Sequence, residues 1–470
     1  MTQPTATTVI LSPETTPGHV HVNDLTRESA LLVSELLTKN HTLYKTRWKL
    51  TLHNHLTHHL LAMWALGATP AEIQDMWDYN TPYQDDMNPG YPEASFNDGL
   101  HDPEIFEKCL GIDDCYPDFL KFFEEEITSK GMQEVVKEYL FKGDGRANDI
   151  LGRMFADLVH PMIHLGCGIE FNQPSLVAEA LAGACVHDNW PSSFLLPTEE
   201  YVRANPDVPS KSMLQILDSL QADSHISTGT REDDPFNKIP DGFLKRVTPT
   251  QLVPYLSQFQ VKAEPADLKL KLSDMMHTSA YMLGAAQRPG KREAMDFVTL
   301  HAATLAAFLP AILAQDWLSN EDKARLLEAT VRVDAVMYAG TACPPLYADR
   351  VVNYMPQYPT HGWSELFHRA NVYQDEGHAV KLLRALYALE PLELSPDFPI
   401  TKSDFLMIAH MGIDSIERAM TEEDGNNVPK EVAAGVLQRV GRGGEMVVGN
   451  MTRWVFYGGL PNAWRHVPAI

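Results

Sequence analysis

The stretch NHLTHHLLAMWALG, residues 54–67, says most about the fold of this chain. Its apolar residues recur at spacings of three and four, the pattern of a helix. Gly67 stands where that helix should end, because glycine readily takes the left-handed conformation that follows a last turn. Thr69-Pro70-Ala71-Glu72 then forms a capping box with proline at the first helical position. The segment predicts one helix that ends at Gly67 and a second that starts after Thr69.

The same periodicity covers most of the chain and predicts an all-α fold. Helices are expected at residues 25–45, 48–66, 115–141, 147–165, 173–187, 210–222, 265–286, 293–314, 320–339, 374–388, 402–422, 428–441 and 444–456. Strands are not indicated, since short alternating runs joined by Asn-Gly or Asp-Gly turns are absent. A GxGxxG after a strand and a GxxxxGK[ST] are absent as well, which argues against a Rossmann or P-loop site.

Two segments stand apart from the helical pattern. Residues 1–23 are rich in Thr and Pro and are expected to be a flexible N-terminal segment. Residues 223–243 are polar and rich in Asp, Pro and Gly, and they predict a long surface loop. Because the histidine groups described below lie on both sides of this loop, we expect residues 24–470 to form a single large multi-helix domain.

Composition narrows the class of partner. The 470 residues carry a formal net charge of -24, which argues against nucleic acid and against an anionic membrane surface. The five cysteines contain no CxxC and fit a reducing compartment. No apolar run approaches the roughly 18 residues of a membrane span. We expect a cytoplasmic protein with a small-molecule partner, and the sequence does not indicate its oligomeric state.

Histidines gather in groups at helical spacing. Four lie within residues 53–59, and His160 and His164 flank Pro161, which predicts a bend or a helix start. Residues three or four apart share a helix face, and imidazole is the commonest side-chain metal ligand near neutral pH. A single histidine is more often a hydrogen-bonded core residue than a ligand. The density of the groups nevertheless favours a buried metal site between helices.

Three more residues can join such a site. His301 lies in a wholly apolar helical run, where it is expected to be buried and neutral, the form that binds metals. His378 and Lys381 lie one turn apart in a helix with an acidic start. A buried lysine loses its proton readily. The neutral amine can add carbon dioxide and become a carbamate, which binds a metal like a carboxylate; the alternative is a solvated surface lysine.

One competing motif is Glu365-x-x-His368, the unit that di-iron helical bundles use twice. Only one copy is present, so a mononuclear, histidine-rich centre is favoured. Such a ligand set suits Fe, Zn, Cu or Ni.

Several blocks resemble the questin oxidase-like family. The first is residues 54–68; the second is His160-Pro161-Met162-Ile163-His164-Leu165-Gly166 with residues 168–171. His301 in its apolar run and residues 375–386 resemble later blocks. The resemblance runs from about residue 25 to 455. It implies oxidative opening of the central ring of anthraquinones in fungal polyketide pathways, by enzymes often labelled Baeyer–Villiger oxidases. Some members resemble oxygenases without flavin, in which four histidines and a carboxylated lysine hold a non-heme iron.

Carried onto this chain, the resemblance implies a set of roles. The implied metal ligands are His58, His164, His301, His378 and Lys381, and the implied catalytic, substrate-facing residues are His55 and His160. Which histidine of each pair binds the metal stays open. The implied cofactor is Fe(II), with NADPH as a candidate external reductant. The implied partners are a small aromatic polyketide and dioxygen, in either a monooxygenase or a dioxygenase reaction.

Two other classes of function stay open. The chain could be a non-catalytic helical polyketide-binding protein whose histidines are structural, which metal analysis would reveal. It could also be a metal-dependent hydrolase with water activated on zinc, which oxygen consumption would distinguish from an oxygenase.

Overall fold

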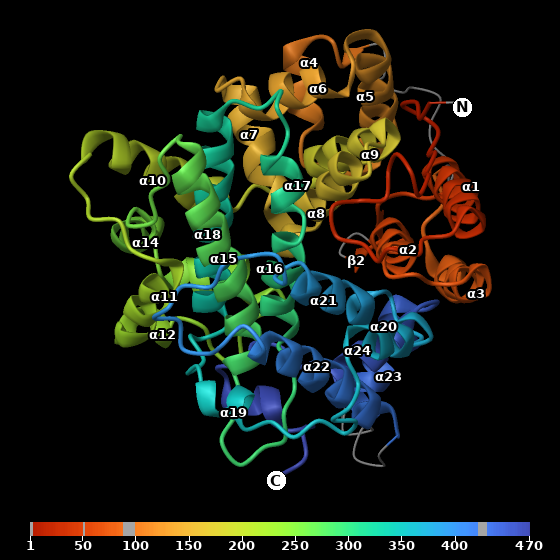
Figure 1. The fold of residues 1–470 in the computed structure, drawn as a ribbon. Coiled ribbons are helices and arrows are strands. Elements are labelled where there is room, and N and C mark those ends of the chain that lie inside the picture. Colours follow the sequence, from red (N-terminus) through yellow and green to blue (C-terminus); the bar gives the residue numbers. More distant parts are fainter. Residues whose placement is uncertain (1–2, 50–51, 88–98, 422–429) are drawn as a thin grey trace. The chain divides into compact units, whose positions relative to one another are not determined.

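The structure is a computed structural model that describes residues 3–49, 52–87, 99–421 and 430–470 (Figure 1). The chain forms two compact units. Unit 1 consists of residues 1–192, 308–319 and 371–381, and unit 2 of residues 193–307, 320–370 and 382–470. Within the described ranges, the only sheet is a two-stranded antiparallel hairpin, so the predicted all-α fold is confirmed.

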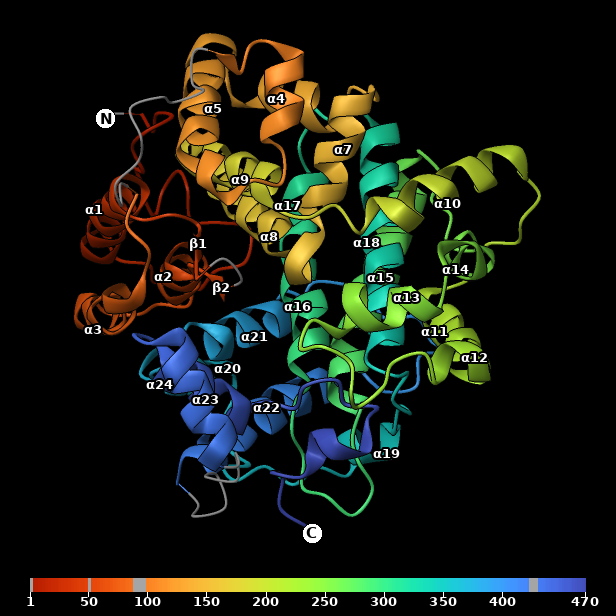
Figure 2. The same cartoon turned by 180° about the vertical axis from the view of Figure 1, so that it is seen from behind.

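Unit 1 is built mainly from the first nine helices of the chain. Its helices are α1 (Arg27–Leu43), α2 (Leu56–Ala65), α3 (Pro70–Asn80), η1 (Thr81–Tyr83), α4 (Pro103–Cys109), η3 (Asp113–Cys115), α5 (Tyr116–Lys130), α6 (Met132–Val136), η4 (Lys137–Phe141), α7 (Gly145–Met154), α8 (Ala156–Glu170), α9 (Pro174–Val186) and α17 (Leu309–Leu313). Figures 1 and 2 show α9 beside both α8 and α5 from opposite sides. The three helices form the centre of this unit.

Unit 2 holds the remaining helices. They are α10 (Ser192–Ala204), α11 (Met213–Ala222), α12 (Ser224–Ser227), η5 (Ile239–Phe243), α13 (Leu244–Arg246), α14 (Pro249–Leu256), α15 (Pro265–Ala285), α16 (Phe297–Ala306), α18 (Asn320–Gly340), α19 (Ala348–Val352), α20 (Trp363–Asn371), α21 (His378–Tyr387), α22 (Asp404–Thr421), α23 (Lys430–Val440), α24 (Gly444–Arg453) and η7 (Pro461–Trp464). The long helix α15 packs against α16, α18 and α22. The first turn of α21 belongs to unit 1.

The opening stretch folds largely as predicted. Helix α2 ends at Ala65, Gly67 follows with a φ of 81°, and Thr69 caps α3 with the expected capping box. The prediction of helix from residue 48 was wrong: β1 (Arg47–Trp48) pairs with β2 (Leu52–His53). The Trp48 indole N–H donates to the carbonyl of His53, so a buried hydrogen bond within the hairpin stabilises it against the local helical pattern.

Other predictions met partial success. The predicted loop at 223–243 contains the short helices α12 and η5, separated by irregular backbone. Helices α4, α10, α14 and α20 were not predicted, and all four are short or interrupted by proline or polar residues. Residues 1–2, 50–51, 422 and 428–429 of the predicted segments lie outside the described residues.

The N-terminal segment has no helix before α1, yet part of it is packed. Val9 and Leu11 are buried, and the backbone N–H of Ile10 donates to Gln173 Oε1 at 2.8 Å. The flexibility of residues 1–23 and the division of the chain into one domain stay predictions.

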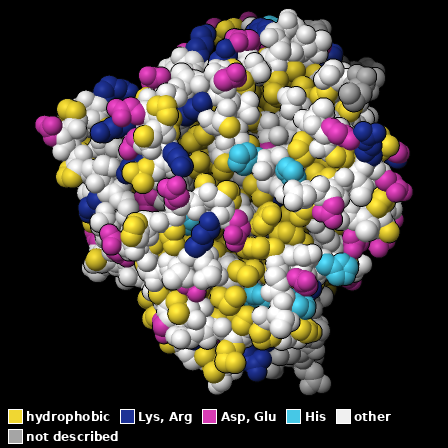
Figure 3. Space-filling model, in the orientation of Figure 1, with side chains coloured by type: hydrophobic (Ala, Val, Ile, Leu, Met, Phe, Trp, Pro, Cys, Tyr) yellow, Lys and Arg dark blue, Asp and Glu magenta, His cyan; other side chains and the backbone are white. Residues whose placement is uncertain are grey.

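The surface carries mixed charge. On the face drawn in Figure 3, basic side chains are interspersed with acidic ones. None of the helices in the described parts of the chain has the length and apolar character needed to cross a membrane.

Helices α8 and α9 approach closely at Gly168. A Cβ atom at this position would lie 2.8 Å from the backbone nitrogen of Val177 and 2.7 Å from its Cγ2. We therefore expect Gly168→Ala to lower the free energy of unfolding by about 1–3 kcal/mol, because the two backbones must separate. Urea denaturation followed by circular dichroism measures the change.

The control is Gly435→Ala in α23, where an added Cβ meets nothing within 4 Å. This substitution should raise the free energy of unfolding by up to about 1 kcal/mol, because alanine has a higher helix propensity than glycine. A neutral or stabilising effect of Gly168→Ala would contradict the close approach of α8 and α9.

Candidate metal centre

Seven buried histidines lie together in unit 1, and we call them the histidine cluster. They are His53 on β2, His55 and His58 at the start of α2, His160 and His164 on α8, His187 after α9, and His378 at the start of α21. Their rings form a continuous series of contacts, with centroids between 3.9 and 5.7 Å apart. The cluster brings together six of the seven residues for which the sequence predicts a metal-binding or catalytic role, if Lys381 beside His378 is included.

The bend predicted at Pro161 is present and is sharper than expected. Asp157, Leu158 and Val159 have φ values of 46°, 53° and 60°, a left-handed turn that comes directly before the regular part of α8. Such backbone is rare for residues other than glycine and has to be held by the surrounding structure. The turn places the Asp157 carbonyl 2.6 Å from His160 Nδ1.

The two predicted catalytic histidines face each other. His55 Nε2 and His160 Nε2 are 2.8 Å apart. A carbonyl oxygen only accepts hydrogen bonds, so in the neutral ring the proton of His160 is on Nδ1, which donates to Asp157. His160 Nε2 is then bare, and His55 Nε2 must either donate to it or share a cation with it.

The pair His58 and His164 is arranged in the same way. His58 Nε2 lies 3.2 Å from His164 Nδ1, and His164 Nε2 lies 2.6 Å from the Oε2 of Glu179. The carboxylate fixes the His164 proton on Nε2 and leaves Nδ1 to face His58. A carboxylate behind an imidazole in this way is the usual support of a metal-binding histidine.

Glu179 also connects the cluster with the surface of unit 1. Its Oε1 accepts from His41 Nδ1 at 2.7 Å, and His41 Nε2 donates to the half-buried Glu124 at 2.8 Å. Burial alone would lower the pKa of His41, but the two carboxylates raise it to about 9. Burial alone would raise the pKa of Glu179, but the bonds from His164 and His41 lower it to about 2.

A second group of ligand atoms surrounds Glu376. Its two carboxylate oxygens lie 3.4 Å from His55 Nδ1 and 3.4 Å from His378 Nδ1. One ligand atom from each of these three residues falls within 4.8 Å of the other two. If His55 donates from Nε2, its Nδ1 is bare, and a bare nitrogen facing a carboxylate oxygen calls for a proton or another cation between them.

Lys381 is buried one turn after His378. Its Nζ makes no hydrogen bond within the described residues. Burial lowers the pKa of the amine to about 8, although Glu376 and Asp375 act in the opposite direction. An amine that is buried and without a hydrogen bond matches the expectation of a lysine that turns inward, and it excludes the solvated alternative.

Gly377 allows this helix start to approach α2. Its φ is 89°, and a Cβ atom there would lie 2.6 Å from Cγ of His59. His59 therefore packs against the start of α21, whereas His58 faces His164. Asp375 caps the turn by accepting from the backbone N–H groups of Gly377 and Ala379.

His301 lies in unit 2, on α16, where it is fully buried and its Nδ1 donates to the carbonyl of Phe297 at 2.7 Å. Its place among the ligands stays a prediction. Glu365 and His368 of the competing motif are both exposed on α20, which argues against a di-iron role.

Several residues of the site were not predicted. Glu376 had a signal, since it belongs to the acidic start that precedes His378. Glu179 also had one, because a glutamate inside the apolar run of α9 must be buried and paired. His53 had one in the dense group at residues 53–59, although a helix was expected there. Asp157 and His187 had none, because their meeting with His53 depends on the hairpin and on the left-handed turn.

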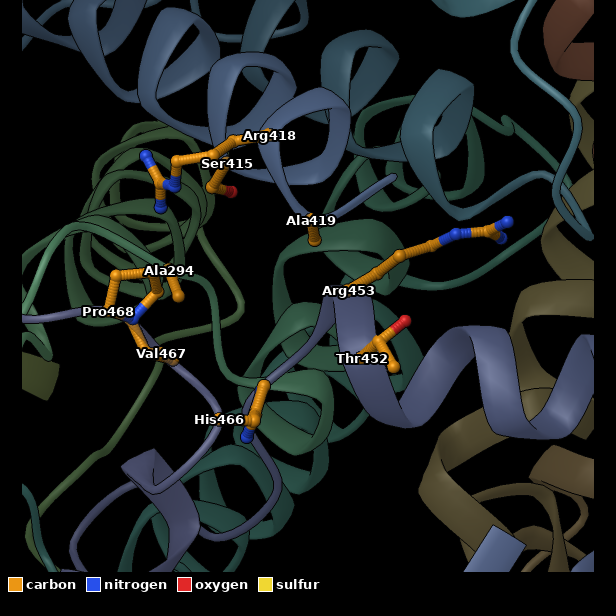
Figure 4. A pocket seen from close by; sticks show the side chains of 9 residues that line it. All are labelled: Ala294, Ser415, Arg418, Ala419, Thr452, Arg453, His466, Val467 and Pro468. Atoms are coloured by element: carbon orange, nitrogen blue, oxygen red, sulfur yellow. The ribbon is translucent and has the colours of Figure 1, made fainter. Parts of the chain in front are cut away.

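A small cavity adjoins the cluster. Its empty volume, including the part open to solvent, is about 240 Å³, and its lining includes His53, His58, His160, His164 and His187. Another cavity lies in unit 2 (Figure 4). There Arg418 and Arg453 extend in opposite directions, and Arg418 donates to the carbonyl of Glu293, so the polar groups do not converge.

Comparison with known proteins gives a consistent result. Residues 52–386 match the model of the questin oxidase-like family. The chain is 42% identical to "Oxidoreductase AflY" of Aspergillus parasiticus over 99% of its own length and 94% of that protein. It is 36% identical to "Baeyer-Villiger oxidase ptaJ" of Pestalotiopsis fici, over 88% of this chain and 94% of that protein. It is 35% identical to "Questin oxidase" of Aspergillus terreus, over 87% of this chain and 93% of that protein.

The His41 contacts predict a pH dependence of stability. Its pKa is raised from the ordinary 6.5 to about 9, so the stabilisation is complete below pH 6.5 and is lost as the pH rises through 9. The shift corresponds to about 3 kcal/mol. Urea denaturation of the wild type and of His41→Gln between pH 6 and pH 10 measures this loss.

We expect the stability of His41→Gln to change less over this range than that of the wild type, by about 3 kcal/mol. The exposed His225→Gln is the control and should follow the wild type. Equal pH dependence in wild type and His41→Gln would contradict the ion pairs of His41.

Proposed function

This chain belongs to the questin oxidase-like family and is an oxidoreductase, and we propose that it is a non-heme iron-dependent oxygenase. Its proposed substrate is an anthraquinone-type polyketide of fungal secondary metabolism, whose central ring it cleaves. The relatives named questin oxidase and Baeyer-Villiger oxidase support the reaction type. The observation that carries the proposal is the meeting of paired imidazoles, a carboxylate and a buried lysine in unit 1.

The residues fit a metal ion. Two nitrogens that bind one ion at about 2.1 Å lie about 3.0 Å apart at 90° and about 3.4 Å apart in a tetrahedral arrangement. The His55–His160 and His58–His164 pairs have nitrogens 2.8 and 3.2 Å apart. The hydrogen bond from His164 to Glu179 leaves Nδ1 directed at His58. Imidazole with a carboxylate or carbamate is a ligand set typical of non-heme iron(II).

We propose that His58, His164, His378 and Lys381 hold the ion; that His301 is a further ligand is implied by the family resemblance alone. His55 and Glu376 are the competing ligands. Glu376 lies 3.4 Å from both His55 Nδ1 and His378 Nδ1, and His55 Nε2 lies 2.8 Å from His160 Nε2. Measuring bound iron in His55→Gln and His58→Gln distinguishes the two sets. If the proposed set is right, His58→Gln should lose iron and His55→Gln should keep it.

The proposed role of Lys381 is that of a carbamate. The amine that reacts with carbon dioxide is the neutral one, and burial increases its population at neutral pH by lowering the pKa. The carbamate would carry a negative charge into a buried site that has several neutral imidazoles. A bound cation would offset the cost of burying that charge.

When bound, iron(II) would supply the electrons that activate dioxygen, which amino-acid side chains cannot provide. The residues of this chain would position the substrate and exchange protons with it. Burial, Lys381 and His160 lower the pKa of His55 well below its ordinary value, so the ring is neutral at pH 7. Since His160 holds its proton on Nδ1, its Nε2 would be the nitrogen that accepts the proton of a phenol hydroxyl, once the substrate has separated it from His55.

The histidines of the site are almost completely buried, with one small cavity beside them. Each histidine of the cluster is less than one-tenth exposed. In such surroundings a hydrogen bond or an ionic contact is stronger than in water, and a hydroxylated aromatic ring can be held by a few polar contacts.

Turnover of a hydroxyanthraquinone under labelled dioxygen tests the proposed reaction. The expected result is a ring-opened acid that contains oxygen-18, formed in air and not under argon. One labelled atom per product indicates a monooxygenase and two indicate a dioxygenase, and omission of NADPH shows whether a reductant is required. Product formation without dioxygen, or with label from water alone, would contradict an oxygenase and favour the hydrolase.

Replacement of Lys381 tests the ligand set. Lys381→Ala should lose bound iron and activity, whereas Lys381→Glu should retain part of both, because a carboxylate can take the place of the carbamate. In the wild type, carbon-13 NMR after growth in labelled bicarbonate should show a carbamate signal that Lys381→Ala lacks.

Lys45→Ala is the matched control, since Lys45 is also a buried lysine of unit 1 but pairs with Asp113. It should keep its iron. Wild-type levels of iron and activity in folded Lys381→Ala would refute the assignment.

A further inference from the structure

A second group of metal-ligand side chains lies beside the first one. We propose that His53, Asp157 and His187 form a second site for a divalent transition-metal ion, separate from the proposed iron ligands. One ligand atom from each of the three residues lies within 4.8 Å of the other two. None of these residues belongs to the set proposed above for iron.

The two imidazoles already have the spacing of metal ligands. His53 Nε2 and His187 Nε2 are 2.9 Å apart, close to the roughly 3.0 Å between neighbouring ligands of one ion. Both rings are buried, and burial is the main cause that lowers the pKa of each well below its ordinary value. The rings are therefore neutral at pH 7, the form in which histidine binds a metal.

Asp157 supplies the carboxylate. Its Oδ2 lies 3.6 Å from His53 Nδ1, and its side chain is 31% exposed. Because His53 faces His187 with Nε2 and Asp157 with Nδ1, the carboxylate must move toward the two Nε2 atoms to reach ligand spacing. A half-buried aspartate can make this shift by rotation of its side chain.

The left-handed turn gives Asp157 this position. With a φ of 46°, Asp157 directs its carbonyl to His160 and its carboxylate to His53. A right-handed helical turn would not present both groups in this way. The turn thus connects the two groups of ligands, because the ring of His160 stacks on that of His53 with centroids 3.9 Å apart and planes 3° from parallel.

The nearest cation does not occupy the position between the three ligands. Burial raises the pKa of Asp157 to about 6 and lowers the pKa of His53 and His187 well below its ordinary value, and the positive charge of Arg47 acts to lower the pKa of all three groups. Its guanidinium is engaged elsewhere, donating to the carbonyl of Val186 at 3.2 Å and pairing with Asp113 at 3.4 Å.

The site would have open coordination positions. His53 and His187 both line the cavity beside the cluster, so water can reach an ion held there. Two imidazoles and one carboxylate suit Zn²⁺, Fe²⁺ or Co²⁺, and three protein ligands leave at least one position for water.

Cobalt binding to the protein after removal of its metals tests the proposal. Equilibrium dialysis against Co²⁺, followed by elemental analysis, counts the ions, and the visible absorption of Co²⁺ reports nitrogen and oxygen ligands. We expect His187→Gln and Asp157→Asn each to hold one Co²⁺ per chain fewer than the wild type, or to bind it at least 100-fold more weakly. Lys381→Ala should still bind this Co²⁺ ion. Loss of the proposed iron site can therefore be distinguished from loss of the second site.

Asp188→Asn is the matched control, because it removes the same charge from an exposed neighbour of the site and should bind as the wild type does. Circular dichroism confirms that each variant is folded. If His187→Gln does not fold, the conservative Asp157→Asn decides the question alone. Unchanged cobalt stoichiometry and affinity in folded Asp157→Asn would overturn the second site.

Discussion

Burial of seven imidazole rings in one unit is the constraint on which the site depends. A buried imidazole nitrogen needs a proton donor, an acceptor or a cation beside it, and water is not at hand to supply any of them. Carbonyl and carboxylate groups settle the protons of His160 and His164, because these groups only accept. Their other nitrogens then face a second imidazole at 2.8 and 3.2 Å. The arrangement is complete either as pairs of hydrogen-bonded rings or as the ligand shell of an ion, and Lys381 would favour the ion if it carried the proposed carbamate.

The fold supplies this arrangement through three unusual pieces of backbone. The hairpin at Trp48 and His53 delivers β2 to the site, the left-handed turn at Asp157 to Val159 orients the start of α8, and Gly377 lets the start of α21 approach His59. Each is a local departure from regular helix and costs conformational energy. The packing of α8 on α9 at Gly168 holds the surrounding helices close enough to maintain them.

The sequence predicts the regular parts of this structure well and its junctions poorly. The pattern of the apolar residues predicts α1, α9, α15 and α18 nearly to their ends. The two histidine pairs also follow from spacing along a helix. That His55 faces His160, and His58 faces His164, depends on how α2 meets α8, which no local pattern contains. His53 and Asp157 were missed for the same reason, because a hairpin and a left-handed turn place them.

The central claim is that the buried imidazoles of this chain bind a transition metal. X-ray absorption at the iron edge of the purified protein tests it most directly. The account predicts nitrogen and oxygen ligands at about 2.0–2.2 Å, with the multiple scattering that imidazole rings produce. Protein without a transition metal after reconstitution under argon, or a spectrum without imidazole scattering, would contradict it.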